Sequence, residues 1–282
     1  MRITVLGSGG CTVTPRPLCR CRVCETARDK GKAHVRTGPS IFLHDAHLLI
    51  DTPAEIAWQL DRTPIERLDA IMLTHLDPDH VEGIRVVEQL ALDFRTWRAY
   101  PGKRVRLLLP EDLNHQLSGL QTIYGPMSLF FEEQGFLERV IFRDETQLNS
   151  VRINAIAIHH VDTVAFVYVF RKDGKKIIFA PCDIKPFPCH LELVHHADLL
   201  FIQPGMFETG LADRFSFPPD HVSRTTLYTF DETLALVRRI GARQTVFVHI
   251  EEYWNRTADD YARLEKQFDN IRFAHDGMQL MV

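Results

Sequence analysis

Short apolar runs separated by polar turns recur along the chain, and they predict β-strands. The run at 151–158 alternates between apolar and polar residues. Asp173-Gly174 separates two later runs and is a hairpin signal, and a further hairpin is expected around residues 44–47. We predict strands at residues 3–6, 41–43, 48–50, 70–73, 105–109, 151–158, 164–170, 176–179, 197–202, 245–248 and 279–281.

Helical periodicity appears between these runs. Apolar residues recur at helical spacing from residue 81 to 91, and Thr229 with Glu232 forms a capping box that opens another helix. We predict helices at residues 55–60, 81–91, 113–123, 233–240 and 261–268. The irregular segment 206–228 is long for a loop in a compact domain and is typical of a lid or a substrate wall.

Composition narrows the class of protein. The 282 residues are 45% hydrophobic and 25% charged, as in a soluble globular chain. The formal net charge of -4 gives no attraction to nucleic acid or to an anionic membrane. No apolar run approaches the roughly 18 residues of a membrane helix, and the first residues read as a strand rather than a signal peptide. We expect a cytoplasmic protein.

Three cysteines, Cys19, Cys21 and Cys24, lie within six residues, inside a cysteine-rich loop at about residues 11–34. In a cytosolic chain such a cluster favours a metal site over a disulfide framework. Three thiolates supply three corners of a tetrahedral zinc site, with a fourth ligand from elsewhere. Glu252 and His34 are both candidates for it. The alternative is three reduced, unliganded thiols on a basic loop.

Strand ends carry most of the remaining candidate chemistry. His75, Asp77, Asp79 and His80 lie on a tight loop between a predicted strand and a predicted helix, where nitrogen and carboxylate ligands suit a divalent metal. Alternatively, Asp77 or Asp79 simply caps that helix. Other strand ends present Asp51, His160, Asp183 and His249. Because strand ends at one edge of a sheet converge, we expect these residues to lie close together. Asp51 either caps the segment that follows it or hydrogen-bonds a metal ligand.

This order of motifs resembles the metallo-β-lactamase superfamily of hydrolases, which has a His-x-His-x-Asp-His loop, then a lone His, an Asp and a final His. His75, Asp79 and His80 match the loop, Ala-Ile-His-His160 the lone His, Phe-Ala-Pro-Cys-Asp183 the Asp motif, and Val-Phe-Val-His249 the last. The resemblance spans nearly the whole chain. It implies an α/β (α+β) fold, a four-layer αββα sandwich built as a single domain over residues 1–282, with metals at one edge between the sheets.

Within the superfamily, the cysteine cluster ahead of residues 36–40 (Arg-Thr-Gly-Pro-Ser) resembles the PhnP-like branch of phosphoribosyl cyclic phosphate phosphodiesterases. That resemblance implies a small, cyclic phosphodiester substrate and a structural zinc on the first loop. The branch completes this zinc with a His where the present chain has Glu252. It also has a catalytic His where this chain has Leu227, and His221 is the candidate to replace it.

The resemblance implies two catalytic metal ions. We expect one ion on His75, Asp77 and His160, and the other on Asp79, His80 and His249. Asp183 would bridge the two ions, and Asp51 would orient a ligand. A hydroxide held between the ions would attack phosphorus. His160 is preferred to its neighbour His159. Asp77 stands where the family has its second His, and a carboxylate there favours Mn²⁺ or iron over Zn²⁺.

Other functions stay open. A carboxylate at position 77 also resembles the flavodiiron branch, whose di-iron site makes it an oxidoreductase. A tRNA 3′-processing nuclease shares the motifs, but the acidic charge balance argues against a nucleic-acid substrate. A non-catalytic metal-binding module follows if Asp77 and Leu227 mark a decayed site. No composition signal names the substrate, and a homodimer is left open.

Overall fold

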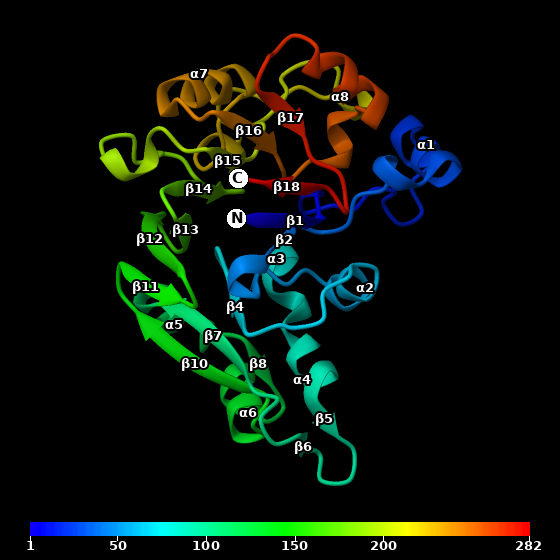
Figure 1. The fold of residues 1–282 in the computed structure, drawn as a ribbon. Helices are drawn as coiled ribbons and strands as arrows, with labels where there is room; N and C mark the ends of the chain where they lie inside the picture. The colour runs from blue at the N-terminus through cyan, green and yellow to red at the C-terminus, as the bar shows by residue number, and fades with distance from the viewer.

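The computed structural model describes all 282 residues, and two seven-stranded mixed sheets form its centre (Figure 1). The first sheet has the order β10-β7-β4-β3-β2-β1-β18. Its strands are, in that order, Leu137–Phe142, Val105–Pro110, Ala70–Met72, Leu48–Ile50, Ser40–Leu43, Arg2–Gly7 and Gln279–Met281. Strands β1 and β18 pair antiparallel, with Ile3 opposite Leu280, so the two chain ends lie side by side.

The second sheet runs in sequence order from β11 to β17. Its strands are Glu145–Leu148, Val151–His159, Val164–Lys172, Lys175–Ala180, Leu199–Ile202, Gln244–Phe247 and Ile271–Phe273. The pairs are antiparallel from β11 to β14 and parallel from β14 to β17. The carboxyl ends of β14, β15 and β16 therefore meet at one edge, where Asp183, Gln203 and His249 follow.

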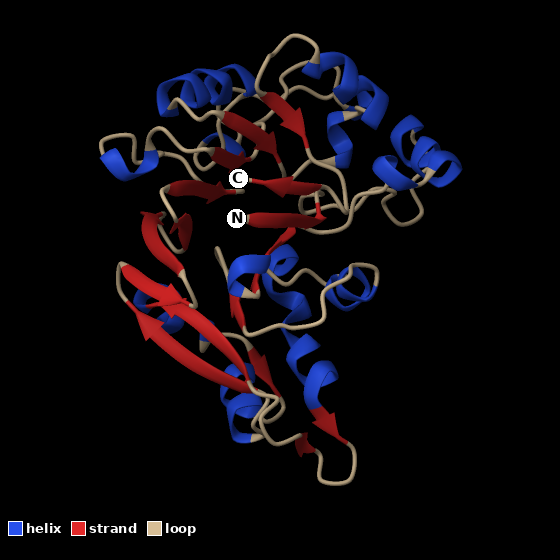
Figure 2. Ribbon diagram, viewed as in Figure 1, coloured by secondary structure: helices blue, strands red, loops and turns tan.

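Helices cover the outer faces of both sheets (Figure 2). The sheets pack on each other through one large apolar core, and the second sheet packs on its helices through another. Alternate side chains of strand β13 point into the two cores. Phe166 and Tyr168 belong to the core between the sheets, and Val167 and Val169 belong to the core beneath the helices. This arrangement confirms the predicted four-layer sandwich.

Five helices contribute to the large core or flank it, namely α2 (Ile56–Asp61), α3 (Pro78–Val81), α4 (Val86–Ala91), α5 (Glu111–Leu117) and α6 (Met127–Glu133). Helices α7 (Phe230–Ile240) and α8 (Ala258–Glu265) pack on the outer face of the second sheet, and α1 (Arg22–Lys30) lies at the side of the molecule. None of the helices is long and apolar enough to cross a membrane.

Smaller elements complete the fold. Two hairpins pair β5 (Leu92–Asp93) with β6 (Arg98–Ala99), and β8 (Gln121–Thr122) with β9 (Gly125–Pro126). Short 3₁₀ helices occur at Lys32–His34, His44–Ala46, Glu82–Arg85, Glu192–Val194, Ala212–Arg214, Val222–Arg224 and Glu252–Trp254.

Two helix predictions were wrong in extent. The helix expected at 113–123 ends at Leu117, because Gly119 follows and residues 121–126 form a hairpin instead. The helix expected at 81–91 is divided into α3, a 3₁₀ turn and α4. Gly83 lies in that turn, where a Cβ atom would come within 2.0 Å of the Pro53 carbonyl oxygen. The close packing of this backbone on the loop after β3 explains why the chain bends there.

Candidate metal centre

The loop after β4 carries four of the predicted ligands. Asp77 occupies the N-cap position of α3, but its side chain makes no capping hydrogen bond. Pro78 at the first helical position starts the helix without needing one. The structure therefore leaves the Asp77 carboxylate free of the capping role that the sequence also allowed. His75 and His80 are buried on the same loop.

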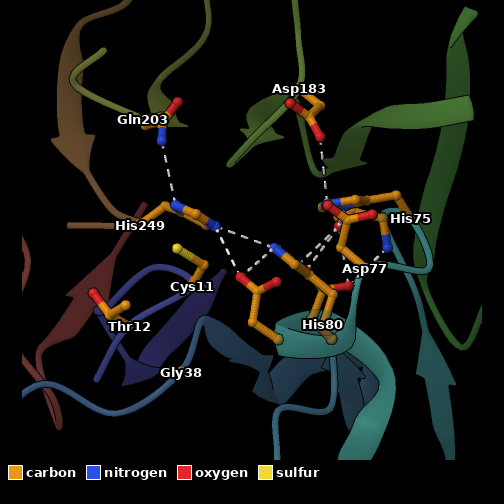
Figure 3. Close-up of polar contacts among 12 residues, drawn as sticks. Cys11, Thr12, Gly38, His75, Asp77, His80, Asp183, Gln203 and His249 are labelled. Atoms are coloured by element: carbon orange, nitrogen blue, oxygen red, sulfur yellow. Dashed lines mark hydrogen bonds and ion pairs between the residues drawn. The ribbon is translucent and has the colours of Figure 1, made fainter. Parts of the chain in front are cut away.

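Three ligand atoms from this loop and from the end of β16 form a tight triangle (Figure 3). His80 Nε2 lies 3.2 Å from His249 Nε2. Asp79 Oδ2 lies 3.2 Å from His249 Nε2 and 3.3 Å from His80 Nε2. Metal–nitrogen bonds of about 2.0–2.1 Å at tetrahedral angles put neighbouring ligand atoms roughly 3.3 Å apart. The triangle therefore has the dimensions of one face of a tetrahedral metal site.

A second, wider group lies beside the first and consists of His75, Asp77 and Asp183. His75 Nε2 lies 3.8 Å from Asp77 Oδ2 and 3.9 Å from Asp183 Oδ2. His75 is only 3% exposed, yet this nitrogen has no hydrogen-bond partner. A buried, unpartnered imidazole nitrogen facing two carboxylates fits a second cation. The structure thus groups Asp79, His80 and His249 as expected, and groups His75 with Asp77, but Asp183 stands in that second group where His160 was expected.

Backbone geometry aims three of these residues. Asp51, Asp183 and His249 directly follow or closely follow β3, β14 and β16, and each has a positive φ, of 63°, 50° and 56°. Non-glycine residues rarely adopt this left-handed conformation, and it concentrates at functional sites. Each of these side chains thus lies where the extended backbone of a strand gives way to a left-handed turn.

Asp51 orients His80. Its carboxylate is fully buried and accepts a hydrogen bond from His80 Nδ1 at 2.9 Å, while Thr74 donates its backbone N–H to the same carboxylate at 2.7 Å. Burial opposes protonation of His80, but Asp51 foremost, with Asp79 and Cys182, outweighs it and raises the pKa of the imidazole. With Nδ1 donating to Asp51, the Nε2 atom faces the centre as a ligand.

Two residues that the sequence analysis missed hold His249. Its Nδ1 lies 3.3 Å from Gln203 Nε2 and 3.4 Å from Glu251 Oε1. Glu251 is buried and also accepts the backbone N–H of Cys11 at 2.9 Å. Gly10 is required here, because a Cβ atom on it would lie 2.0 Å from Glu251 Oε1. An acidic residue two positions after a candidate ligand was the only sequence signal for Glu251.

Two expected site residues lie differently. His160 points inward, but its Nε2 is 2.9 Å from the backbone carbonyl oxygen of Asp183 and outside the two ligand groups. Its neighbour His159 points away, with a 67% exposed side chain beside Asp112. His221 packs on the rings of Phe215 and Phe217 and does not line the pocket over the centre.

The three clustered cysteines converge on Glu252. Its Oε1 atom lies 3.4, 2.8 and 3.2 Å from the sulfur atoms of Cys19, Cys21 and Cys24. Glu252 is 3% exposed. His34, the other candidate for the fourth ligand, instead lies 3.8 Å from Asp259. The donor set of three sulfurs and one oxygen fits a closed, structural zinc site.

A pocket of about 310 Å³ opens over the centre. The segment 206–228 forms one wall of it, with Val222, Ser223, Thr225, Thr226 and Leu227. Metal-ligand candidates Asp77, Asp79, Asp183 and His249 line the floor, together with Cys11 and Cys182. Larger hollows of about 460 and 790 Å³ lie elsewhere and contain none of these residues. The pocket size suits a small molecule.

The carboxylates of the centre are electrostatically unequal. Burial first, then the neighbouring Asp183 and Asp79, raises the pKa of Asp77. Burial also opposes ionisation of Asp79, but hydrogen bonds from His249 and His80 outweigh it and hold that pKa well below its usual range. Three carboxylates within one small pocket repel one another, and divalent cations relieve that repulsion.

A family model described as the beta-lactamase superfamily domain matches residues 46–250. The matched span runs from the strand before Asp51 to just past His249, and it contains both ligand groups.

Solved structures share this fold. A diphosphatase from the PhnP family has a TM-score of 0.75 at 23% identity, covering 100% of this chain and 97% of that one. Zinc-bound PqqB from Methylobacterium extorquens has a TM-score of 0.76 at 17% identity, covering 100% of both chains. The short form of human tRNase Z has a TM-score of 0.61 at 15% identity, covering 100% of this chain and 99% of that one.

A curated octanoyltransferase of Porphyromonas gingivalis is 38% identical over 86 residues. The match covers 30% of this chain and 17% of the octanoyltransferase. The matched part is thus a small fraction of that protein.

Proposed function

Because the chain belongs to the β-lactamase superfamily, we propose that it is a metal-dependent hydrolase that cleaves a small phosphodiester, with a cyclic one as the first candidate. The observation that carries this proposal is the triangle of Asp79, His80 and His249, whose edges of 3.2–3.3 Å match a metal site. The wider group around His75 supplies the second position of a dinuclear centre.

Different side chains would bind the metal ions, orient the ligands and form the wall of the pocket. Divalent ions at these positions would supply Lewis acidity and lower the pKa of water toward about 7. Asp51 is the acceptor for His80 Nδ1 and Glu251 is the acceptor for His249 Nδ1, so that both imidazoles direct Nε2 at the centre. The wall formed by the 206–228 segment shields the reacting group from bulk water and presents hydroxyl groups to it.

Three features support a phosphodiester as the substrate. The named neighbours include a diphosphatase and a tRNase, which are phosphoryl hydrolases by name. Ser223 and Thr226 carry hydroxyl groups at the pocket wall that can donate to phosphoryl oxygens, whereas the Thr225 hydroxyl already donates to the Val222 carbonyl oxygen. The volume of about 310 Å³ favours a small ester over a polymer.

None of the six cysteines forms a disulfide, which fits the proposal of a reducing, cytoplasmic location.

Asp183→Ala tests the proposal. The variant removes a carboxylate that faces His75 from across the centre, so we expect it to lose bound metal and at least about 100-fold in turnover of a chromogenic phosphodiester. His159→Ala is the control, because that side chain is exposed and points away. Full activity in the Asp183 variant would contradict the proposal.

Metal analysis separates this proposal from its alternatives. We expect wild-type protein purified anaerobically to hold three ions, with two retained in Cys21→Ser. The carboxylate of Asp77 beside Asp183 gives a hard, oxygen-rich half-site, which favours a di-iron oxidoreductase as the second candidate. Iron alone at the retained pair, with redox-active spectra, would support that candidate. No metal beyond the cysteine cluster would leave a non-catalytic module.

A further inference from the structure

The thiol of Cys182 lies at the centre of the site without an assigned role. Its sulfur and one ring nitrogen each of His75 and His80 lie within 4.8 Å of one another. These two histidines belong to different halves of the centre. Cys182 therefore lies between the halves rather than in either one. Its side chain is half-buried and lines the same pocket as Asp79 and Asp183.

The place of Cys182 in the chain fixes its direction. It follows β14 by two residues and precedes Asp183, whose positive φ of 50° turns the chain sharply. The turn brings both the thiol of residue 182 and the carboxylate of residue 183 to the sheet edge. Consecutive side chains of a continued strand would instead point to opposite faces.

Two independent observations indicate that the half-site of His75 lacks a donor. His75 Nε2 is buried and has no hydrogen-bond partner. His160, the residue expected to share an ion with it, directs Nε2 at the carbonyl oxygen of Asp183 at 2.9 Å. Since a carbonyl oxygen only accepts, that nitrogen carries the proton and is no ligand. The sulfur of Cys182 is a further donor grouped with His75 and His80.

We propose that Cys182 supplies a thiolate ligand to the dinuclear centre, shared between the His75 and His80 sides. This inference rests on the proposed function only in requiring that the centre binds metal. Sulfur is a soft ligand that suits zinc, whereas carboxylate and water suit manganese. A centre with Cys182 therefore selects Zn²⁺ over Mn²⁺, opposite to the preference expected from Asp77 alone.

Cobalt substitution tests the ligand directly. Co²⁺ bound to thiolate has a sulfur-to-metal charge-transfer band in the near ultraviolet. The wild-type protein would have five cobalt–sulfur bonds, three in the cysteine cluster and two from the shared Cys182. We expect Cys182→Ser to lose roughly two fifths of the band while retaining its cobalt, because serine oxygen gives no such transition.

Cys11→Ser is the matched control. Cys11 lines the same pocket but its sulfur lies 3.4 Å from Glu251 and belongs to no ligand group. We expect this variant to keep the full band. An unchanged band in Cys182→Ser at full cobalt content overturns the inference and leaves the proposed function standing. Absence of cobalt beyond the cysteine cluster in the wild type overturns both.

A measurement on the unaltered chain covers the case in which Cys182→Ser does not fold. Alkylation with iodoacetamide, mapped by mass spectrometry, compares protein with and without added Zn²⁺. We expect zinc to protect Cys182 and to leave the slow modification of Cys11 unchanged, because burial and then Glu251 raise the pKa of the Cys11 thiol to about 12. Equal modification of Cys182 in both samples would contradict the proposed ligand role. A competition with equal Zn²⁺ and Mn²⁺ should leave zinc at the centre, with the preference weakened in Cys182→Ser.

Discussion

A single tyrosine joins the two sheets behind the metal loop. Tyr168 in β13 is completely buried and donates its hydroxyl to the Leu73 carbonyl oxygen at 2.6 Å. Thr74 follows Leu73, and its carbonyl oxygen accepts the backbone N–H of Phe166 in the same strand at 2.9 Å. These bonds hold the backbone immediately before His75 against the second sheet. The position of His75 thus depends on a strand of the opposite layer.

Tyr168→Phe should destabilise the protein by about 1–3 kcal/mol, because the buried carbonyl of Leu73 loses its hydroxyl donor. Tyr261→Phe is the matched control. That tyrosine is equally buried, but its hydroxyl has no hydrogen-bond partner, so its removal should cost nothing or stabilise slightly. Urea denaturation of the two variants measures the difference. Equal losses in both would show that the hydroxyl of Tyr168 contributes nothing specific.

Sequence patterns revealed residues whose side chains carry distinctive chemistry at strand ends. His75, Asp79, His80 and His249 could be identified because a strand followed by His or Asp is legible locally. The contacts of Gln203 and Glu251 and the proposed role of Cys182 could not, because each depends on which distant nitrogen lies beside it in space. The same limit left both His34 and Glu252 possible from spacing. The resemblance favoured Glu252, and the fold places Glu252 against the cysteines.

At the scale of elements, helix α8 is tied to the cysteine loop through its cap. Thr257 and Asp260 form a capping box, with the Asp260 carboxylate accepting from Thr257 N at 2.8 Å. Arg22 of α1 also binds Asp260, at 2.9 Å. Burial would raise the pKa of Asp260, but the hydrogen bonds from Thr257 and then Arg22 lower it to about 2. One carboxylate therefore fixes both the start of α8 and the side of α1.

Asp260→Asn should lower stability by about 0.5–2 kcal/mol at pH 7. A carboxylate whose folded pKa of about 2 lies below its ordinary value of 3.8 stabilises fully above about pH 5. That contribution is lost as pH falls through 4 toward 2, so the gap between wild type and variant should shrink on acidification. Urea titrations from pH 7 to pH 3 measure it, with exposed Asp269→Asn as control. A gap independent of pH would contradict the assignment.

Most strands could be predicted because their apolar runs are short and bounded by turns. The helices were harder. Residues 113–123 carry a helical pattern, but the hairpin at 121–126 uses its own backbone pairing and overrides it. The apolar residues 129–131 lie in α6, which no cap announced in the sequence. Sequence patterns predicted an element correctly where turn residues marked its ends. They failed where tertiary packing selected one of two possible backbone conformations.

Across the whole molecule, the proposed dinuclear centre and the cysteine cluster share one short segment. His249 belongs to the first and Glu252 to the second, with Glu251 between them bound to the backbone of Cys11. The first sheet supplies the His75 loop, and the second sheet supplies Asp183 and His249. The ligand groups therefore form only when the two sheets are packed against each other.

Trp254 reports on this segment. It ends the short helix that begins at Glu252 and is completely buried, whereas Trp58 and Trp97 are 45% and 69% exposed. Stripping metal from the cysteine cluster, or replacing Cys24 by Ser, should loosen Glu252 and shift the emission of Trp254 to longer wavelength. Cys11→Ser should leave the emission unchanged. An unshifted spectrum after verified metal loss would show that the segment is held without the ion.

The position of the shared segment late in the chain also determines when the proposed metal sites can form during synthesis. The cysteine trio and the His75 loop leave the ribosome early, while His249 and Glu252 come near the end of the chain. At about 5–20 residues per second, the early ligands wait roughly 10 to 45 s for their partners. During that interval the nascent thiols stand open to oxidants and to stray metal ions. Metal binding at both proposed sites thus waits until residues 249–252 have been made and have folded against the earlier ligands.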